Sequence, residues 1–246
     1  MNLLITGASS GIGAALAAEY ARRGAENIFV CGRNAERLDA VCRDIGAASR
    51  SAGAKIHQRI IDITDAAAVR AWIVECHATA PLDLVVANAG IGTPDEDEAA
   101  SRATIATNID GVANTVFPAL DLKVPQIALV SSLTAYHGMP SCPSYAASKA
   151  FVKSWGAGLR GKYARCGIKV NTVCPGFVRS RITDRNTCPM PFFMEANKAA
   201  WIISRDLAKN KGLITFPWQM RFAMWFLSTL PEFISEKIFA KLPEKA

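Results

Sequence analysis

Residues 3–19 read Leu-Leu-Ile-Thr-Gly-Ala-Ser-Ser-Gly-Ile-Gly-Ala-Ala-Leu-Ala-Ala-Glu: an apolar strand pattern, a glycine-rich turn and a helical pattern in direct succession. Glycines in such a turn let the backbone bend tightly and approach a bound group closely. The free amides at the start of the following helix favour negative charge, so a pyrophosphate suits this position. An ordinary strand-to-helix turn can carry the same glycines. Its place between a strand and a helix favours a dinucleotide site.

The alternation of strand and helix patterns continues through most of the chain. Strand patterns occur near residues 2–6, 27–31, 55–61, 82–87, 125–130, 168–174 and 213–216, and helical patterns occur near 11–23, 34–51, 65–78, 97–117, 145–164 and 190–209. Such alternation is typical of repeated βαβ units. We therefore expect an α/β fold, Rossmann-like and doubly wound, with a mainly parallel seven-stranded sheet and helices on both faces. We expect Asn34 and Thr64 to cap two of the helices.

Length and composition limit the possible classes of protein. A chain of 246 residues, half of them apolar, fits one domain spanning residues 1–246. The net charge is +7, but the basic residues are scattered and form no run of four, so we expect no nucleic-acid partner. His57, His77 and His137 fall on separate elements without ligand spacing, and we expect no metal.

The cysteines and the N-terminal residues of the sequence both bear on the cellular compartment of the protein. The seven cysteines are an odd number and contain no C-x-x-C spacing, which favours reduced thiols. Met1 and Asn2 lead directly into the first strand pattern, so we expect no signal peptide. Together these observations predict a cytoplasmic protein.

A phenol and an ammonium stand four residues apart at Tyr145 and Lys149, so a helix would present both on one face. A neighbouring ammonium should lower the pKa of the phenol and allow it to exchange protons with an alcohol. By itself the pair is common on solvated helix faces. Its interpretation therefore depends on Ser132, at the end of the fifth strand pattern, and on Asn108 in the preceding helical pattern.

Taken together, these motifs resemble the short-chain dehydrogenase/reductase family over residues 2 to about 185. The resemblance rests on T-G-x-x-x-G-x-G from Thr6 to Gly13, on Asn88-Ala89-Gly90, on the four residues just described, and on Pro175-Gly176 after the sixth strand pattern. It departs from the family's N-N-A-G at Ala87. It implies an NAD(P)-binding oxidoreductase that transfers a hydride between a nicotinamide and a carbonyl or alcohol carbon of a small molecule.

The resemblance also implies roles for individual residues. Ser132 would bind the substrate oxygen, and Tyr145 would act as acid and base. Lys149 would hold the nicotinamide ribose and tune Tyr145, and Asn108 would support a water that links Lys149 to solvent. The implied cofactor contacts are Gly7, Ser9, Ser10, Gly11, Ile12, Gly13, Arg33, Asp62, Ile63, Asn88, Ala89, Gly90, Tyr145, Lys149, Pro175, Gly176, Val178 and Ser180. Asp62 would contact the adenine, although it could equally be a turn or cap residue before the helix that begins near Asp65.

The end of the second strand pattern bears on the choice of cofactor. The sequence there is Cys31-Gly32-Arg33-Asn34, whereas NAD-dependent relatives carry an acid that binds the ribose hydroxyls. The absent carboxylate removes a charge that would repel a 2′-phosphate, and the guanidinium can bind one bidentately. We therefore expect NADP(H) to be preferred, with NAD(H) as the second possibility. The alternative is that Arg33 is a solvated residue at a strand end.

The last third of the chain carries less information. Residues 180–210 form the expected substrate-loop region, in which residues 188–194 suit either a lid or a plain surface loop. Residues 217–246 form an apolar helical C-terminus, too often interrupted for a membrane span. Its aromatic stripe comprises Trp218, Phe222, Trp225, Phe226 and Leu230.

Two interpretations remain open, one for the role of the aromatic stripe and one for the function of the whole protein. We expect the stripe to be buried in a pocket wall or in the interface of a homodimer or homotetramer, in preference to peripheral contact with a membrane. A sensor or scaffold that binds NADP(H) without turnover is the alternative to an enzyme. The complete set of four catalytic residues favours the enzyme, because a binding module has no chemical need for them. No motif identifies the substrate.

Overall fold

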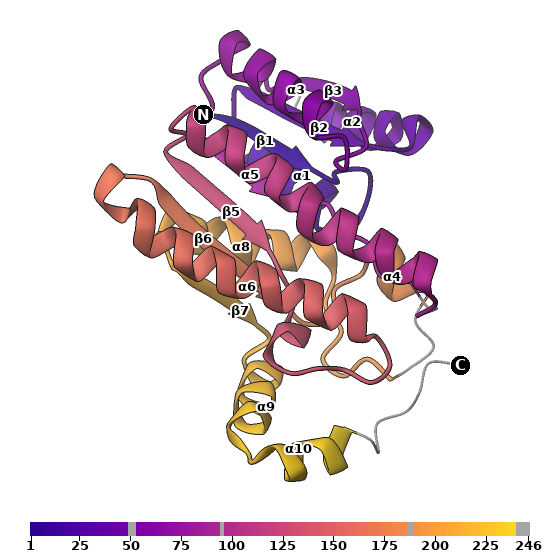
Figure 1. Cartoon of the computed structure of the whole chain (residues 1–246). Helices are drawn as coiled ribbons and strands as arrows, with labels where there is room; N and C mark the ends of the chain where they lie inside the picture. The colour runs from indigo at the N-terminus through magenta and orange to yellow at the C-terminus, as the bar shows by residue number, and fades with distance from the viewer. Residues whose placement is uncertain (49–52, 94–95, 186–188, 240–246) are drawn as a thin grey trace.

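The computed structural model describes residues 1–48, 53–93, 96–185 and 189–239 (Figure 1). In this part of the chain one parallel sheet has the order β3-β2-β1-β4-β5-β6-β7. Its strands are β1 (Asn2–Thr6), β2 (Asn27–Gly32), β3 (Lys55–Ile60), β4 (Leu84–Ala87), β5 (Gln126–Val130), β6 (Lys169–Pro175) and β7 (Leu213–Phe216). The predicted seven-stranded parallel sheet is confirmed.

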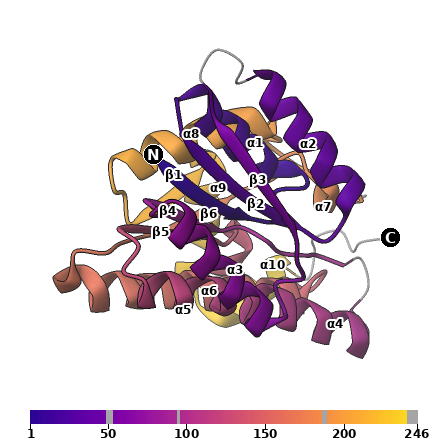
Figure 2. The ribbon, with the colours of Figure 1, turned by 90° about the horizontal axis from the view of Figure 1, so that it is seen from above.

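Helices cover both faces of the sheet, as Figure 2 shows from above. The helices are α1 (Gly11–Arg22), α2 (Ala35–Ala48), α3 (Ala66–Thr79), α4 (Glu98–Ile105), α5 (Gly111–Asp121), α6 (Pro143–Tyr163), α7 (Arg181–Asp184), α8 (Ala196–Ala208), α9 (Trp218–Thr229) and α10 (Glu232–Phe239). One face packs against α1, α2 and α8, and the other against α3, α5 and α6. This arrangement confirms the predicted Rossmann-like, doubly wound fold.

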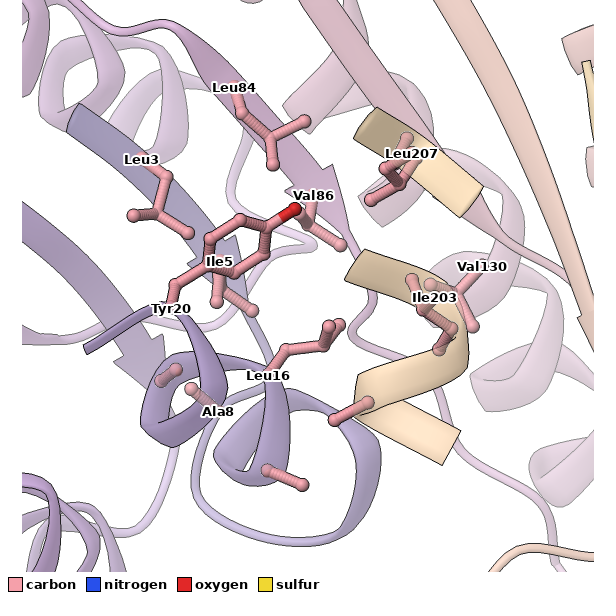
Figure 3. Packing of buried hydrophobic residues seen from close by; sticks show 14 of the residues in the cluster. Leu3, Ile5, Ala8, Leu16, Tyr20, Leu84, Val86, Val130, Ile203 and Leu207 are labelled. Atoms are coloured by element: carbon pink, nitrogen blue, oxygen red, sulfur yellow. The ribbon is translucent and has the colours of Figure 1, made fainter. Parts of the chain in front are cut away.

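Because both faces are covered, a central strand must be apolar at successive positions. In β1, Leu3 and Ile5 belong to the core cluster on the α1 and α8 side, and Leu4 belongs to the cluster on the opposite side. Figure 3 shows Leu3 and Ile5 beside Tyr20 of α1, in the same cluster as Leu16 of α1 and Ile203 of α8. A continuous apolar run therefore forms a strand here, since alternation of apolar and polar residues would leave one face unpacked.

The order in which the chain adds strands to the sheet changes direction between β1 and β4. From β1 the strand order runs outward through β2 to β3, and from β4 it runs the other way to β7. Such a reversal leaves a crevice beyond the carboxyl ends of the two central strands, where ligands of α/β proteins bind. The glycine-rich turn follows β1, and Asn88-Ala89-Gly90 follows β4, so both motifs lie at this crevice.

One predicted helix extends further than expected and contains a π turn, and two other local predictions were wrong. The helix expected over 97–117 is α4 and α5 joined by a π turn, Ala106–Asp110, and it continues to Asp121. The helix expected from 190 begins at Ala196, because the backbone of Met194 is extended and pairs with Phe177 and Arg179. The N-cap of α3 is Asp65, whose side chain accepts from Ala68 N, and not Thr64.

The C-terminal helices α9 and α10 extend beyond the sheet after β7 (Figure 1). Within the chain, the expected burial of the aromatic stripe is wrong: Trp218 is 72% exposed, and Phe222, Trp225 and Phe226 are at least half exposed. The stripe faces outward because α9 turns Met220 and Met224 toward the protein instead. No helix within the described ranges has both the length and the apolar character needed to cross a membrane.

Candidate functional site

A cavity of about 840 Å³ lies at the crevice, a size within the range of about 300–1,000 Å³ typical of small-molecule sites. Most of the residues selected from the sequence line it: Gly7, Ser9, Ser10, Gly11, Ile12, Arg33, Ile63, Asn88, Ala89, Gly90, Ser132, Tyr145, Lys149, Pro175, Gly176, Val178 and Ser180. Gly13, Asp62 and Asn108 are not part of the lining. The structure therefore gathers segments far apart in sequence around one volume.

Two glycines of the first turn are required by close packing. Gly7 has a φ of +69°, and a Cβ there would lie 2.6 Å from Ala89 Cα. A Cβ on Gly13 would lie 2.4 Å from Gly7 O and 2.6 Å from Asn88 Nδ2. Contacts this short are repulsive, so any side chain at Gly13 would separate the turn from the loop after β4. Gly13 thus shapes the site from outside the cavity.

Asn88 joins the glycine-rich turn to the loop after β4. Its Nδ2 donates to Thr6 O at 3.0 Å and to Gly7 O at 3.1 Å. In return, Thr6 Oγ1 accepts from the backbone amides of Asn88 and Ala89, each at 3.2 Å. These bonds hold the two sides of the crevice together and explain the need for an amide at this position.

Ser132 and Tyr145 meet in the cavity from two different elements. Ser132 precedes the 3₁₀ turn Leu133–Tyr136, and Tyr145 lies in the first turn of α6, which begins at Pro143. Burial raises the pKa of Tyr145 to about 12, while a hydrogen bond with Ser132 acts in the opposite direction. The expectation of a lowered pKa for Tyr145 is therefore wrong for this structure, because desolvation of the phenolate outweighs the favourable contact.

Lys149 lies one helical turn beyond Tyr145 and is only 3% exposed. Its Nζ donates to Val130 O at 3.1 Å and lies 5.6 Å from the centre of the Tyr145 ring. Burial lowers the pKa of Lys149 to about 8. The ammonium therefore carries a positive charge at neutral pH but loses its proton far more readily than a solvated lysine.

Asn108 is fully buried in the π turn, next to the cavity but behind its wall. Its Oδ1 accepts from Ile91 N at 2.8 Å, and its Nδ2 donates to Ile91 O at 2.9 Å and to Ser148 Oγ at 3.0 Å. Ser148 Oγ in turn donates to Tyr145 O at 2.7 Å. Asn108 thus connects the loop after β4 to the helix that carries Tyr145, and its role toward a bound water stays a prediction.

Arg33 and Asp62 lie together at the edge of the cavity. Arg33 Nη1 is 3.5 Å from Asp62 Oδ2, with both side chains roughly half exposed, so the pair is weak. The other carboxylate oxygen of Asp62 accepts from Thr64 N at 3.0 Å and from Thr64 Oγ1 at 2.9 Å. The structure therefore shows Asp62 in the turn before α3. Contact with an adenine stays a prediction.

The structure adds lining residues that the sequence did not indicate. They include the three arginines Arg37, Arg181 and Arg185, and the methionines Met220 and Met224 of α9. Helical spacing could have suggested Arg37, four residues after Arg33, and the Met220/Met224 pair opposite the aromatic stripe. Arg181 directly follows Ser180, which the family resemblance selected, whereas only the path of the chain after β6 brings Arg185 to the cavity.

The histidines and cysteines have other surroundings. His57 Nε2 lies 3.1 Å from Asn27 Oδ1, and His77 Nδ1 accepts from Leu82 N at 3.2 Å. Among the described residues, no group of three or more His, Cys, Asp or Glu could hold a metal ion. Free thiols are found at Cys31, Cys42, Cys76, Cys166 and Cys174, and Cys188 lies outside the described residues.

Comparison with known proteins agrees with this geometry. The model of the short chain dehydrogenase family matches residues 1–189. An uncharacterized oxidoreductase of Myxococcus xanthus is 35% identical over 237 residues, covering 93% of this chain and 92% of the relative.

Two solved structures share the fold. A short-chain dehydrogenase from Sphingobium yanoikuyae in complex with NADPH has a TM-score of 0.78 at 23% identity and covers 94% of this chain and 96% of that one. A short chain dehydrogenase from Mycobacterium paratuberculosis bound to NAD has a TM-score of 0.75 at 22% identity, over 87% and 95%. The chain thus belongs to the short-chain dehydrogenase family, whose members are oxidoreductases that act on alcohol or keto groups with a nicotinamide cofactor.

Proposed function

We propose that this protein is an NADPH-preferring reductase or dehydrogenase in which Tyr145 exchanges the proton and Ser132 binds the substrate oxygen. The observation that carries the proposal is the composition of one cavity. Ser132, Tyr145 and Lys149 line it beside β5, and arginines line it beside β2, on the other side of the crevice. No Asp or Glu is found among the described residues that line it.

The cavity fits a dinucleotide phosphate cofactor. The Nε of Arg37 is hidden from solvent and has no hydrogen-bond partner in the described part of the chain. A buried donor without an acceptor costs about 1–3 kcal/mol, and a phosphate oxygen would remove that cost. Arg33 and Arg37 would hold the 2′-phosphate, the glycine-rich turn the pyrophosphate, and Lys149 the nicotinamide ribose.

The side chains of the site suit proton transfer at neutral pH. The nicotinamide, when bound, supplies or accepts the hydride. The Ser132 hydroxyl donates to the substrate oxygen and orients it toward Tyr145. Because the pKa of Tyr145 is raised to about 12, its phenol is protonated at pH 7 and serves as the acid in carbonyl reduction. In the oxidative direction the phenol must first release its proton to solvent, and the resulting phenolate accepts the proton of the alcohol.

Replacing Arg33 with alanine should weaken NADPH binding about tenfold or more and change NADH binding far less, since a charge-assisted contact contributes roughly 1.5–3 kcal/mol. Titration of nicotinamide fluorescence measures both affinities. Arg59→Ala is the matched control, because Arg59 lies on β3, the strand next to β2, pairs with Glu75 of α3 and lies outside the cavity. Equal losses for the two cofactors in Arg33→Ala would exclude a 2′-phosphate contact.

The substrate is best sought by direct assay. Ketones, aldehydes, sugars and acyl carbonyls should be screened with NADPH, monitoring absorbance of the reduced nicotinamide. Turnover of a carbonyl that disappears in the Tyr145→Phe variant would support the proposal. Tight NADPH binding without turnover of any class would contradict an enzymatic function.

We also propose that the protein forms a homodimer or homotetramer through the aromatic stripe of α9. Large exposed aromatic side chains on one helix face are typical of an interaction surface. Light scattering should give a small multiple of the 26.4 kDa chain mass, and Phe222→Glu with Trp225→Glu should reduce it to that mass. Phe117→Glu, on α5, is the control for a charge at an exposed aromatic elsewhere. A monomeric wild-type protein would refute this assembly.

A further inference from the structure

Four arginines converge on the cavity from two separate parts of the chain. Arg33 and Arg37 come from the end of β2 and the first turn of α2, and Arg181 and Arg185 come from α7 and the residue after it. Together with Lys149 they make up all the charge on the described lining, which holds no carboxylate. Outside the lining, Asp62 lies 3.5 Å from Arg33 in a weak, half-exposed pair. The remaining excess of like charge marks a site for an anion.

The position of α7 brings its arginines to this site. The Ser180 side chain caps α7 by bonding with Thr183, whose Oγ1 also donates to Val178 O at 3.1 Å. Ser180 packs directly on the glycine-rich turn, since a Cβ on Gly11 would lie 2.9 Å from Ser180 Cβ. The short helix α7 is therefore held by its own hydrogen bonds and packs on the glycine-rich turn.

The electrostatics of Arg181 agree with this placement. The charge of Arg37 is the largest cause that lowers the pKa of Arg181, and Arg185 and Arg33 act in the same direction. Guanidiniums from both sides of the cavity are thus close enough to repel one another. By contrast Arg179, two residues earlier, pairs with Glu195 at 2.9 Å and lies outside the lining.

We propose that Arg181, assisted by Arg185, binds the 2′-phosphate of NADP(H) from the side opposite Arg33 and Arg37, so that this phosphate bridges α7 to the β2–α2 segment. The inference rests on the proposed NADPH preference and adds a second source of specificity. Because Arg181 belongs to α7, the 2′-phosphate would also hold α7 at the cavity. NADH lacks the bridging group, so α7 would keep only its own contacts with the glycine-rich turn.

The test compares the affinities of NADPH and NADH in Arg181→Ala, Arg181→Lys and Arg179→Ala by nicotinamide fluorescence. Arg181→Ala should weaken NADPH about tenfold, as expected for loss of one charge-assisted contact. NADH, which retains the pyrophosphate, should change by less than about twofold, the scale of a screened surface charge. Arg181→Lys should recover part of the loss, and Arg179→Ala should leave the ratio unaltered.

Two outcomes would overturn the inference. An equal loss for both cofactors in Arg181→Ala would mean that Arg181 binds the pyrophosphate or only shapes the loop. No loss for either would remove it from the site. If the wild-type protein prefers NADPH and loses that preference in Arg33→Ala but not in Arg181→Ala, only this inference fails. If the wild-type protein shows no preference at all, the proposed cofactor fails with it.

Discussion

Replacing Tyr145 with phenylalanine should lower kcat by about 10²–10⁴-fold, the usual contribution of a general acid or base. The substitution removes one oxygen and keeps the ring that lines the cavity. NADPH affinity and the thermal midpoint should therefore stay close to the wild-type values. Nicotinamide fluorescence reports binding, and the absorbance of the reduced cofactor reports turnover.

Tyr136→Phe is the matched control for this experiment. Tyr136 is the last residue of the 3₁₀ turn that follows Ser132, but it is not part of the cavity lining. Losing its hydroxyl should leave kcat almost unaltered. A Tyr145→Phe protein that binds NADPH normally and turns over near the wild-type rate would refute the proton-transfer role, even with the fold and the cofactor unchanged.

Replacing Lys149 with methionine should lower both kcat and NADPH affinity, because the ammonium would serve the ribose and the phenol at once. A combined loss of the order of 10²-fold or more in kcat/KM is expected when a charged hydrogen-bond donor and its effect on an acid are removed together. Tyr145→Phe should affect kcat alone. Comparing the two variants therefore separates proton transfer from cofactor binding.

Lys149→Met should lower the activity but should not lower the thermal stability of the protein at pH 7. The folded protein lowers the pKa of Lys149 from 10.5 to about 8, so folding disfavours the charged form. This penalty is fully present below pH 8 and is lost as the pH rises from 8 to 10.5. At pH 7 the methionine variant should unfold at a temperature equal to or above that of the wild type, and the difference should shrink toward pH 10.

Lys153→Met is the control, since Lys153 lies over the Tyr136 ring at 4.3 Å and does not line the cavity. It should preserve kcat/KM. The assignment of Lys149 would be contradicted by a Lys149→Met protein that keeps wild-type affinity and rate. A large drop in its thermal midpoint at pH 7 would instead assign Lys149 a structural role through its bond to Val130 O.

Sequence patterns were sufficient for the features that depend on neighbours along the chain. The apolar run of β1, the glycines after it and the i, i+4 pair of Tyr145 and Lys149 are local patterns. Strand and helix periodicities are local as well, so the order and type of most elements could be predicted. Boundaries were less accurate where a distant segment intervenes, as at Met194, whose backbone pairs with Phe177 and Arg179.

Features that depend on distant surroundings were decided only by the tertiary structure. The aromatic stripe of α9 is outward because Met220 and Met224 face the cavity; periodicity identifies an apolar face but not what covers it. The pKa of Tyr145 is raised because desolvation depends on every element around the phenol, while the sequence shows only its neighbour Lys149. The convergence of Arg181 with Arg33 and Arg37 arises likewise from the path after β6, which places α7 on the glycine-rich turn. The sequence alone therefore determined which chemical groups the site contains. The tertiary packing determined the pKa values of these groups and which other side chains lie beside them.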